Sequence, residues 1–139
     1  WIEVARCWLE GLCIVAAARA NGSKGKLSLA RKFVAKLEKW ARISPSNYGN
    51  KVALLKAEYF ALKGRKVEAL LQYQKAIEIS SNEGLIHDEA LACEKVSEFL
   101  ESTGFVCNVS WETYMSQAIE LYEKWGATAK VEQLVNRLT

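Results

Sequence analysis

Apolar residues recur every three or four positions along most of the chain, as they do on one face of an α-helix. Between residues 26 and 43, for example, Leu27, Ala30, Val34 and Leu37 share one face. No segment shows the two-residue alternation of a half-buried strand. The pattern predicts helices over residues 1–20, 26–43, 50–63, 65–82 and 86–102, a sixth between Ser110 and Gly126, and a seventh over 127–138.

Glycines punctuate this pattern at regular intervals. Gly22, Gly64 and Gly104 are 42 and 40 residues apart, and Gly84 and Gly126 are 42 apart. Each follows a stretch with helical spacing, and glycine closes a helix well because it adopts the left-handed conformation without steric cost. A period of about 40 residues with two helices per unit is typical of a stacked helical solenoid.

The repeat also appears in the letters, because "KAIEIS" (75–80) corresponds to "QAIELY" (117–122). Pro45 marks the boundary within the first part of the chain, and Trp125 is expected to face inward and cover the last hairpin. We therefore predict a single all-α domain over residues 1–139, a right-handed α-solenoid of about three helical hairpins plus a C-terminal helix. The approximate repeats are 1–45, 46–83 and 84–126, followed by the terminal helix 127–138.

One set of residues resembles the tetratricopeptide repeat. In "ALLKAEYFALKGRKVEALLQYQKAIEIS", the family's small and aromatic positions are matched at the right mutual spacing by Ala57, Phe60, Ala69, Tyr73 and Ala76. The period of about 40 is longer than the usual 34, so the resemblance is to a tetratricopeptide-like repeat.

A narrower resemblance covers most of residues 27–138. The segments "LARKFVAKLEKWA", "GLIHDEALACEKVSEFLESTG" and "AIELYEKWGATAKVEQL" are similar to the helical-repeat region of very large signalling kinases. In those proteins the region lies between serine/threonine kinase-like and AAA-type ATPase modules and a sensor histidine kinase. The resemblance implies a cytoplasmic, non-catalytic regulatory segment. The chain begins with Trp rather than Met, and we expect it to be part of a larger protein.

Charge is unevenly distributed along the chain, although the net charge is only +3. Residues 1–66 hold fourteen Lys and Arg against four Glu, and residues 67–139 hold five against twelve Asp and Glu. This division favours charge-driven self-association or docking to neighbouring domains.

The sequence predicts no catalytic residue, no metal site and no cofactor. His87, Asp88 and Glu89 with Cys93 form the best nominal constellation, but acids in the first turn of a helix are explained by its dipole. The four cysteines form no C-x-x-C pair, and "NGSKGK" lacks the spacing of a phosphate loop.

We therefore expect a protein-protein interaction and regulatory scaffold module, which presents a helical surface to a peptide, a protein or neighbouring domains. The surface is expected on the first helix of each pair, with candidate contacts at Lys56, Glu58, Lys63, Glu94, Lys95 and Glu98. Two alternatives remain open: a rigid spacer between signalling domains, or weak anion or nucleic-acid binding by the basic helix 26–42. Its basic face consists of Arg31, Lys32, Lys36 and Lys39, which a solvated surface also explains. Nucleic acid is not the expected partner, and no membrane association is expected.

Overall fold

The chain is helical throughout the part that the structure, a computed structural model, describes: residues 2–21, 24–43 and 45–139. Within these ranges it contains no strand, which confirms the all-α class. Trp1 and the predicted helix stop at Gly22 lie outside the described residues. The helices are α1 (Ile2–Asn21), α2 (Lys24–Ile43), α3 (Pro45–Leu62), α4 (Lys66–Asn82), α5 (Ile86–Thr103), α6 (Trp111–Trp125) and α7 (Thr128–Leu138).

The predicted boundaries hold to within a few residues except at α3. That helix begins at Pro45, five residues before the predicted start at residue 50. The polar segment that follows Pro45 reads as a loop, but proline is well suited to the first position of a helix. Its fixed φ matches the helix, and its missing N–H would have no partner there.

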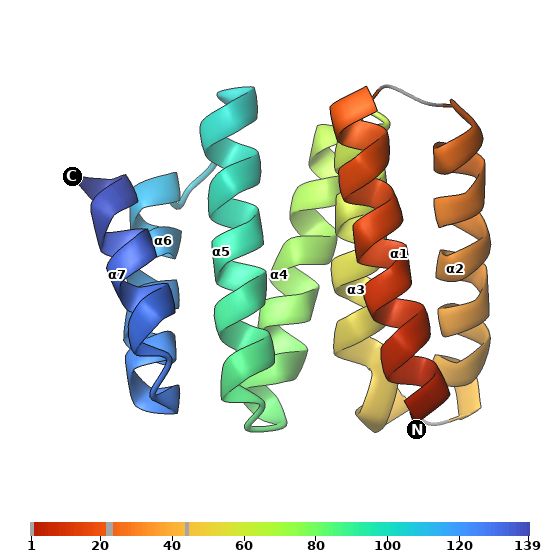
Figure 1. The fold of residues 1–139 in the computed structure, drawn as a ribbon, viewed down its shortest axis with the longest axis horizontal. Coiled ribbons are helices and arrows are strands. Elements are labelled where there is room, and N and C mark those ends of the chain that lie inside the picture. Colours follow the sequence, from red (N-terminus) through yellow and green to blue (C-terminus); the bar gives the residue numbers. More distant parts are fainter. Residues whose placement is uncertain (1, 22–23, 44) are drawn as a thin grey trace. The chain divides into compact units, whose positions relative to one another are not determined.

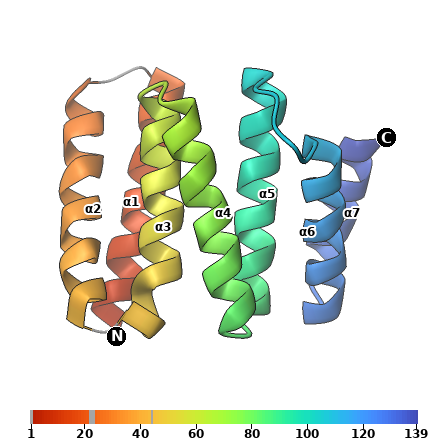
Figure 2. The same ribbon diagram turned by 180° about the vertical axis from the view of Figure 1, so that it is seen from behind.

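Contacts divide the chain into two compact units, residues 1–76 and 77–139, with the boundary inside α4. The single domain predicted for residues 1–139 stays a prediction. In unit 1, α2 packs against both α1 and α3, and α1 also contacts α3 (Figures 1 and 2). Val15, Leu37 and Leu55 from these three helices are at most 1% exposed. Burying each such side chain contributes about 1.5–3 kcal/mol.

Gly11 allows the close approach of α1 to its neighbours. A Cβ atom at this position would lie 2.9 Å from Leu55 Cδ2 on α3 and 3.3 Å from Phe33 Cβ on α2. The absence of a side chain at Gly11 is therefore a packing requirement of unit 1.

In unit 2, α6 packs against both α5 and α7, and the two figures show α6 and α7 side by side (Figures 1 and 2). Its core cluster is formed by residues from all three helices: Ala90, Cys93, Met115, Ala118, Tyr122 and Leu134. Leu134 is the buried residue of α7, whose outward positions are mostly polar. The short α7 thus covers the apolar side of α6 and presents a polar surface to solvent.

Three of the described helix junctions share one geometry. Gly64, Gly84 and Gly126 have φ angles of 78°, 70° and 88°. Each glycine N–H donates to the carbonyl three residues back, and the next N–H donates to the carbonyl five residues back. This is the Schellman helix ending, and the next helix starts at once. Gly104 is also left-handed, with φ 67°, but the loop 105–110 follows it. The predicted glycine stops after α3, α4, α5 and α6 are confirmed.

Candidate functional site

The six candidate contact residues fall into two groups by burial. Glu58 and Glu94 are each only 4% exposed, whereas Lys56, Lys95 and Glu98 are partly exposed and Lys63 is exposed. The two buried carboxylates are engaged inside their units, so only the other four side chains are placed to meet a partner. Whether those four bind one stays a prediction.

Glu58 connects three helices of unit 1. The Tyr73 hydroxyl on α4 donates to Glu58 Oε2 at 2.8 Å, and Arg19 Nη2 on α1 lies 2.7 Å from the same oxygen. The Arg19 side chain is 48% exposed while that of Glu58 is 5% exposed. A charge this deeply buried is tolerated because it is both paired and hydrogen-bonded.

Glu94 is held in the same way in unit 2. The Tyr122 hydroxyl on α6 donates to Glu94 Oε1 at 2.8 Å, and Lys130 Nζ on α7 lies 2.9 Å from Glu94 Oε2. Lys130 Nζ also lies 5.9 Å from the centre of the Tyr122 ring. Burial, followed by the neighbouring Glu94 charge, raises the pKa of Tyr122, so its hydroxyl remains a proton donor at neutral pH.

The two arrangements follow one plan. In each, a buried glutamate on the first helix of a pair accepts from a tyrosine on the second helix, and a cation comes from a third helix. Sequence reasoning missed both cations, Arg19 and Lys130. A usable signal was present, because a buried tyrosine needs a partner for its hydroxyl. Tyr73 and Tyr122 both share the helical spacing of the apolar residues around them, which predicts inward-facing side chains.

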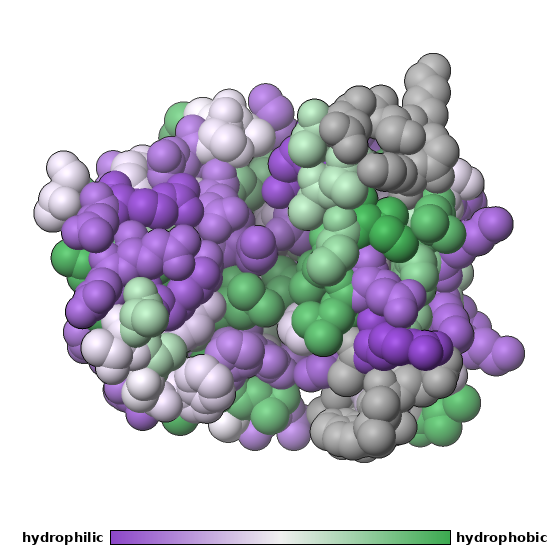
Figure 3. Space-filling model, viewed as in Figure 1, coloured by the Kyte–Doolittle hydropathy of each residue, from purple (hydrophilic) through white to green (hydrophobic). Residues whose placement is uncertain are grey.

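A second set of ion pairs joins α5 to α7 at the surface of unit 2. Arg137 Nη1 lies 3.3 Å from Glu98 Oε1, and Arg137 Nη2 lies 3.5 Å from Glu101 Oε2. Lys95 Nζ lies 4.0 Å from Glu98 Oε2. Burial raises the pKa of Glu98 in spite of the nearby Lys95 and Arg137. Where α5 and α7 face the viewer in Figure 3, the surface is largely hydrophilic.

The lysine candidates of unit 1 make weak local contacts. Lys56 Nζ on α3 lies 3.8 Å from Glu38 Oε1 on α2. Lys63 Nζ lies 5.5 Å from the centre of the Tyr59 ring. Contacts of this kind on partly exposed side chains are worth little, so both ammonium groups can re-pair with another molecule at small cost.

The basic face of α2 lies where the sequence placed it. Its four predicted residues are all exposed: Arg31, Lys32, Lys36 and Lys39. Lys36 Nζ lies 5.1 Å from the centre of the Trp40 ring on the same helix. Trp40 is itself half-buried, so the face offers cations but not an open aromatic platform for bases.

The residues of the nominal catalytic constellation all lie in the first half of α5. His87 Nδ1 lies 3.8 Å from Asp88 Oδ1, and the His87 ring packs against Trp125 with 4.4 Å between ring centres. Burial, with a smaller effect of the Glu89 charge, raises the pKa of Cys93 to about 12. The thiol is therefore protonated at neutral pH and is a poor nucleophile. In the part of the chain that the structure describes, no three His, Cys, Asp or Glu side chains are placed to hold a metal ion.

Trp125 departs from its expected place. It is 57% exposed at the end of α6, rather than buried as a cover over the last hairpin. The left-handed Gly126 ends α6 directly after it, so the indole lies at the end of the helix, where it contacts His87 in the first turn of α5.

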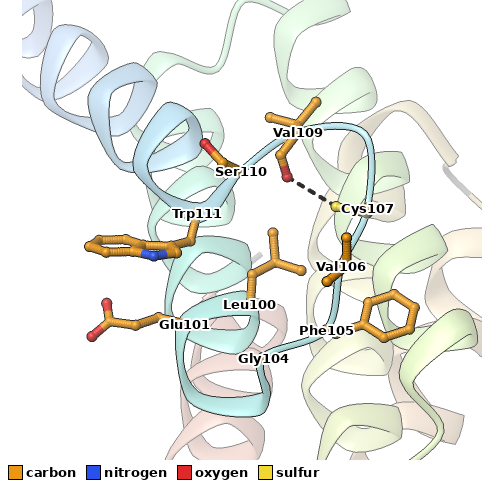
Figure 4. Close-up of a pocket in the computed structure, with 9 residues that line it drawn as sticks. All are labelled: Leu100, Glu101, Gly104, Phe105, Val106, Cys107, Val109, Ser110 and Trp111. Carbon is orange, nitrogen blue, oxygen red and sulfur yellow. Dashed lines mark hydrogen bonds between the residues drawn. The ribbon is translucent and has the colours of Figure 1, made fainter.

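Two surface pockets are found in unit 2. One, of about 320 Å³, lies between the end of α5 and the loop 105–110, where Leu100, Phe105 and Trp111 surround it (Figure 4). The Cys107 thiol in this loop donates to the Val109 carbonyl at 3.0 Å. The other pocket, of about 290 Å³, lies beside Trp125.

No protein-family model matches the chain, and no curated protein or solved structure does. None of the described helices is both long enough and apolar enough to cross a membrane.

Proposed function

We propose that the chain is a tetratricopeptide-like interaction and regulatory module within a larger cytoplasmic signalling protein, without chemistry of its own. The observation that carries the proposal is the glutamate-tyrosine-cation arrangement repeated around Glu58 and Glu94. The part that recurs is the Glu–Tyr hydrogen bond between the two helices of a pair, which a stacked repeat predicts. The cation comes from an earlier helix, α1, in unit 1 and from the following helix, α7, in unit 2.

Helix contacts within each unit support a stacked arrangement of hairpins. In unit 1 the first helices α1 and α3 contact each other as well as α2. In unit 2 the first helix α5 is joined by ion pairs to α7, which in a solenoid would be the first helix of a following pair. A right-handed solenoid places all its first helices on one concave face, where such modules bind peptides.

In unit 1 the proposed binding residues are Lys56 on α3 and Lys63 in the turn directly after it, and in unit 2 they are Lys95 and Glu98 on α5. Glu58 and Glu94 are left out, because their carboxylates stabilise the packing and are not accessible. Mixed charge on partly exposed side chains suits a polar peptide, whose recognition depends on electrostatic complementarity more than on apolar burial.

A charge-matched pair of variants tests the proposal. Lys56→Glu changes the first helix of a pair, and Lys75→Glu makes the same change at an exposed position on the second helix. We expect the chain to bind a partner from cytoplasmic extract saturably, and we expect Lys56→Glu but not Lys75→Glu to weaken that binding. If both variants bind the partner as tightly as the wild type, the binding site lies elsewhere. If no partner binds saturably, the rigid spacer is favoured.

Self-association is a second candidate activity, because the charge division coincides with the two units. Unit 1 carries fifteen Lys and Arg against five Glu, and unit 2 carries four against eleven Asp and Glu. Unit 1 of one copy can therefore attract unit 2 of another. Sedimentation equilibrium at low and high salt tests this, and an association constant that does not fall with salt excludes charge-driven docking.

A further inference from the structure

The pocket beside Trp125 combines an exposed aromatic ring, aliphatic side chains and a carboxylate. It is about 290 Å³ in volume and is lined by Gly84, Leu85, Ile86, His87, Asp88 and Trp125. The residues come from the turn before α5, the first turn of α5 and the last residue of α6. Both helix ends lie at the same end of unit 2 (Figure 1).

The Trp125 ring is supported but still accessible. It lies against His87 with 4.4 Å between ring centres and 31° between the planes, and His87 in turn meets Tyr122 edge-on at 6.2 Å. Because Tyr122 is fixed by Glu94, this stack connects the surface ring to the core. Even so, 57% of Trp125 remains exposed. A rigid, exposed tryptophan is the kind of side chain that dominates binding at protein interfaces.

The surroundings of the ring select a cationic ligand. Asp88 lines the pocket with its side chain 16% exposed, and its Oδ1 lies 3.8 Å from His87 Nδ1. Unit 2 as a whole has seven more acidic than basic residues. An indole face attracts a cation through its quadrupole, and the carboxylate adds a direct charge partner.

The aliphatic rim selects a cation on an apolar stem. Leu85 and Ile86 are 36% and 37% exposed beside the ring. An arginine side chain fits all three features, because its methylene stem packs on aliphatic groups, its planar guanidinium stacks on an indole, and its N–H groups pair with a carboxylate. We propose that this pocket binds an arginine side chain of a basic partner segment. None of the binding residues named in the proposed function lines this pocket, and the proposal does not depend on that function.

The test is a titration of the 139-residue chain with an acetylated, amidated Gly-Arg-Gly peptide, followed through the indole N–H resonances in NMR. The chain has five tryptophans, and the Trp125 resonance is identified by its loss in Trp125→Phe. We expect this resonance to shift saturably. The same peptide with citrulline in place of arginine keeps the shape but not the charge, and we expect it to bind roughly fivefold more weakly.

Two variants distinguish binding in this pocket from non-specific attraction of the peptide to the acidic surface of unit 2. Asp88→Asn removes the carboxylate that lines the pocket, and Glu112→Gln removes a first-turn acid at the other end of α6, about 20 Å away along the helix. We expect only Asp88→Asn to weaken binding, by roughly two- to fivefold. Equal shifts with arginine and citrulline, or equal weakening by the two variants, would overturn the proposal. None of these outcomes changes the result expected for Lys56→Glu, so the arginine pocket and the proposed function are tested independently.

Discussion

The tyrosine hydroxyl that reaches Glu94 gives the sharpest test of the packing. Tyr122→Phe removes one O–H group, keeps the ring in the core cluster, and deprives Glu94 Oε1 of a donor at 2.8 Å. A hydrogen bond to a charged group is worth about 1.5–3 kcal/mol, and an unsatisfied buried acceptor adds its desolvation cost. Because Lys130 still pairs with the other oxygen, we expect a loss near the lower end, about 1.5–2 kcal/mol.

The loss is measured by urea unfolding followed by far-UV circular dichroism at neutral pH. The matched control is Tyr59→Phe, because Tyr59 is half-buried on α3 and its replacement leaves the Glu94 network intact. We expect that variant to stay within about 0.5 kcal/mol of the wild type. In the double variant Tyr122→Phe/Glu94→Gln, the combined loss should be smaller than the sum of the single losses, because the two residues share one interaction. Additive losses, or a Tyr122→Phe effect no larger than that of the control, would show that the Tyr122–Glu94 hydrogen bond does not stabilise unit 2.

Three further changes have defined outcomes. Gly11→Ala should destabilise the chain by about 1 kcal/mol, because overpacking against the buried Leu55 outweighs the gain in helix propensity. A higher thermal midpoint of unfolding for the variant would contradict the close packing of α1 against α3 at Gly11. Burial raises the pKa of Glu98 above 4.5, so the folded chain binds this proton more tightly than the unfolded chain does. The folded state therefore loses stability as the pH rises from the unfolded pKa of Glu98 through its folded pKa. Glu98→Gln should therefore be more stabilising at neutral pH than at pH 4, and an equal effect in urea unfolding at both pH values would be inconsistent with this. Ellman's reagent should modify the exposed Cys13 quickly and the buried Cys93 only on unfolding, since burial raises the Cys93 pKa to about 12; equal rates would mean that unit 2 opens readily.

The sequence predicted the helices well because their signals are local. Apolar spacing, the glycines and Pro45 each act within a few residues, so helix type and most boundaries follow from neighbouring letters. The start of α3 was the exception, because a polar first turn after Pro45 resembles a loop.

The candidate site was harder to predict because it depends on distant partners. Glu58 and Glu94 read as surface residues, since charged side chains are almost never buried unless they are paired. Their partners Arg19 and Lys130 are 39 and 36 residues away along the chain, beyond the reach of any helical periodicity. Trp125 reads as core by its spacing, but its place at the last turn of α6 leaves it exposed.

The helix junctions at Gly64, Gly84 and Gly126 have a consequence for how the chain folds. Their hydrogen bonds span at most five residues, so each turn can close before any distant part of the chain has arrived. Chains dominated by such near-neighbour pairings have low contact order and fold in microseconds to milliseconds. In the solenoid that we propose, folding can begin at any of these turns and spread outward, and a chain shortened by one terminal hairpin should keep turns that nucleate unaided.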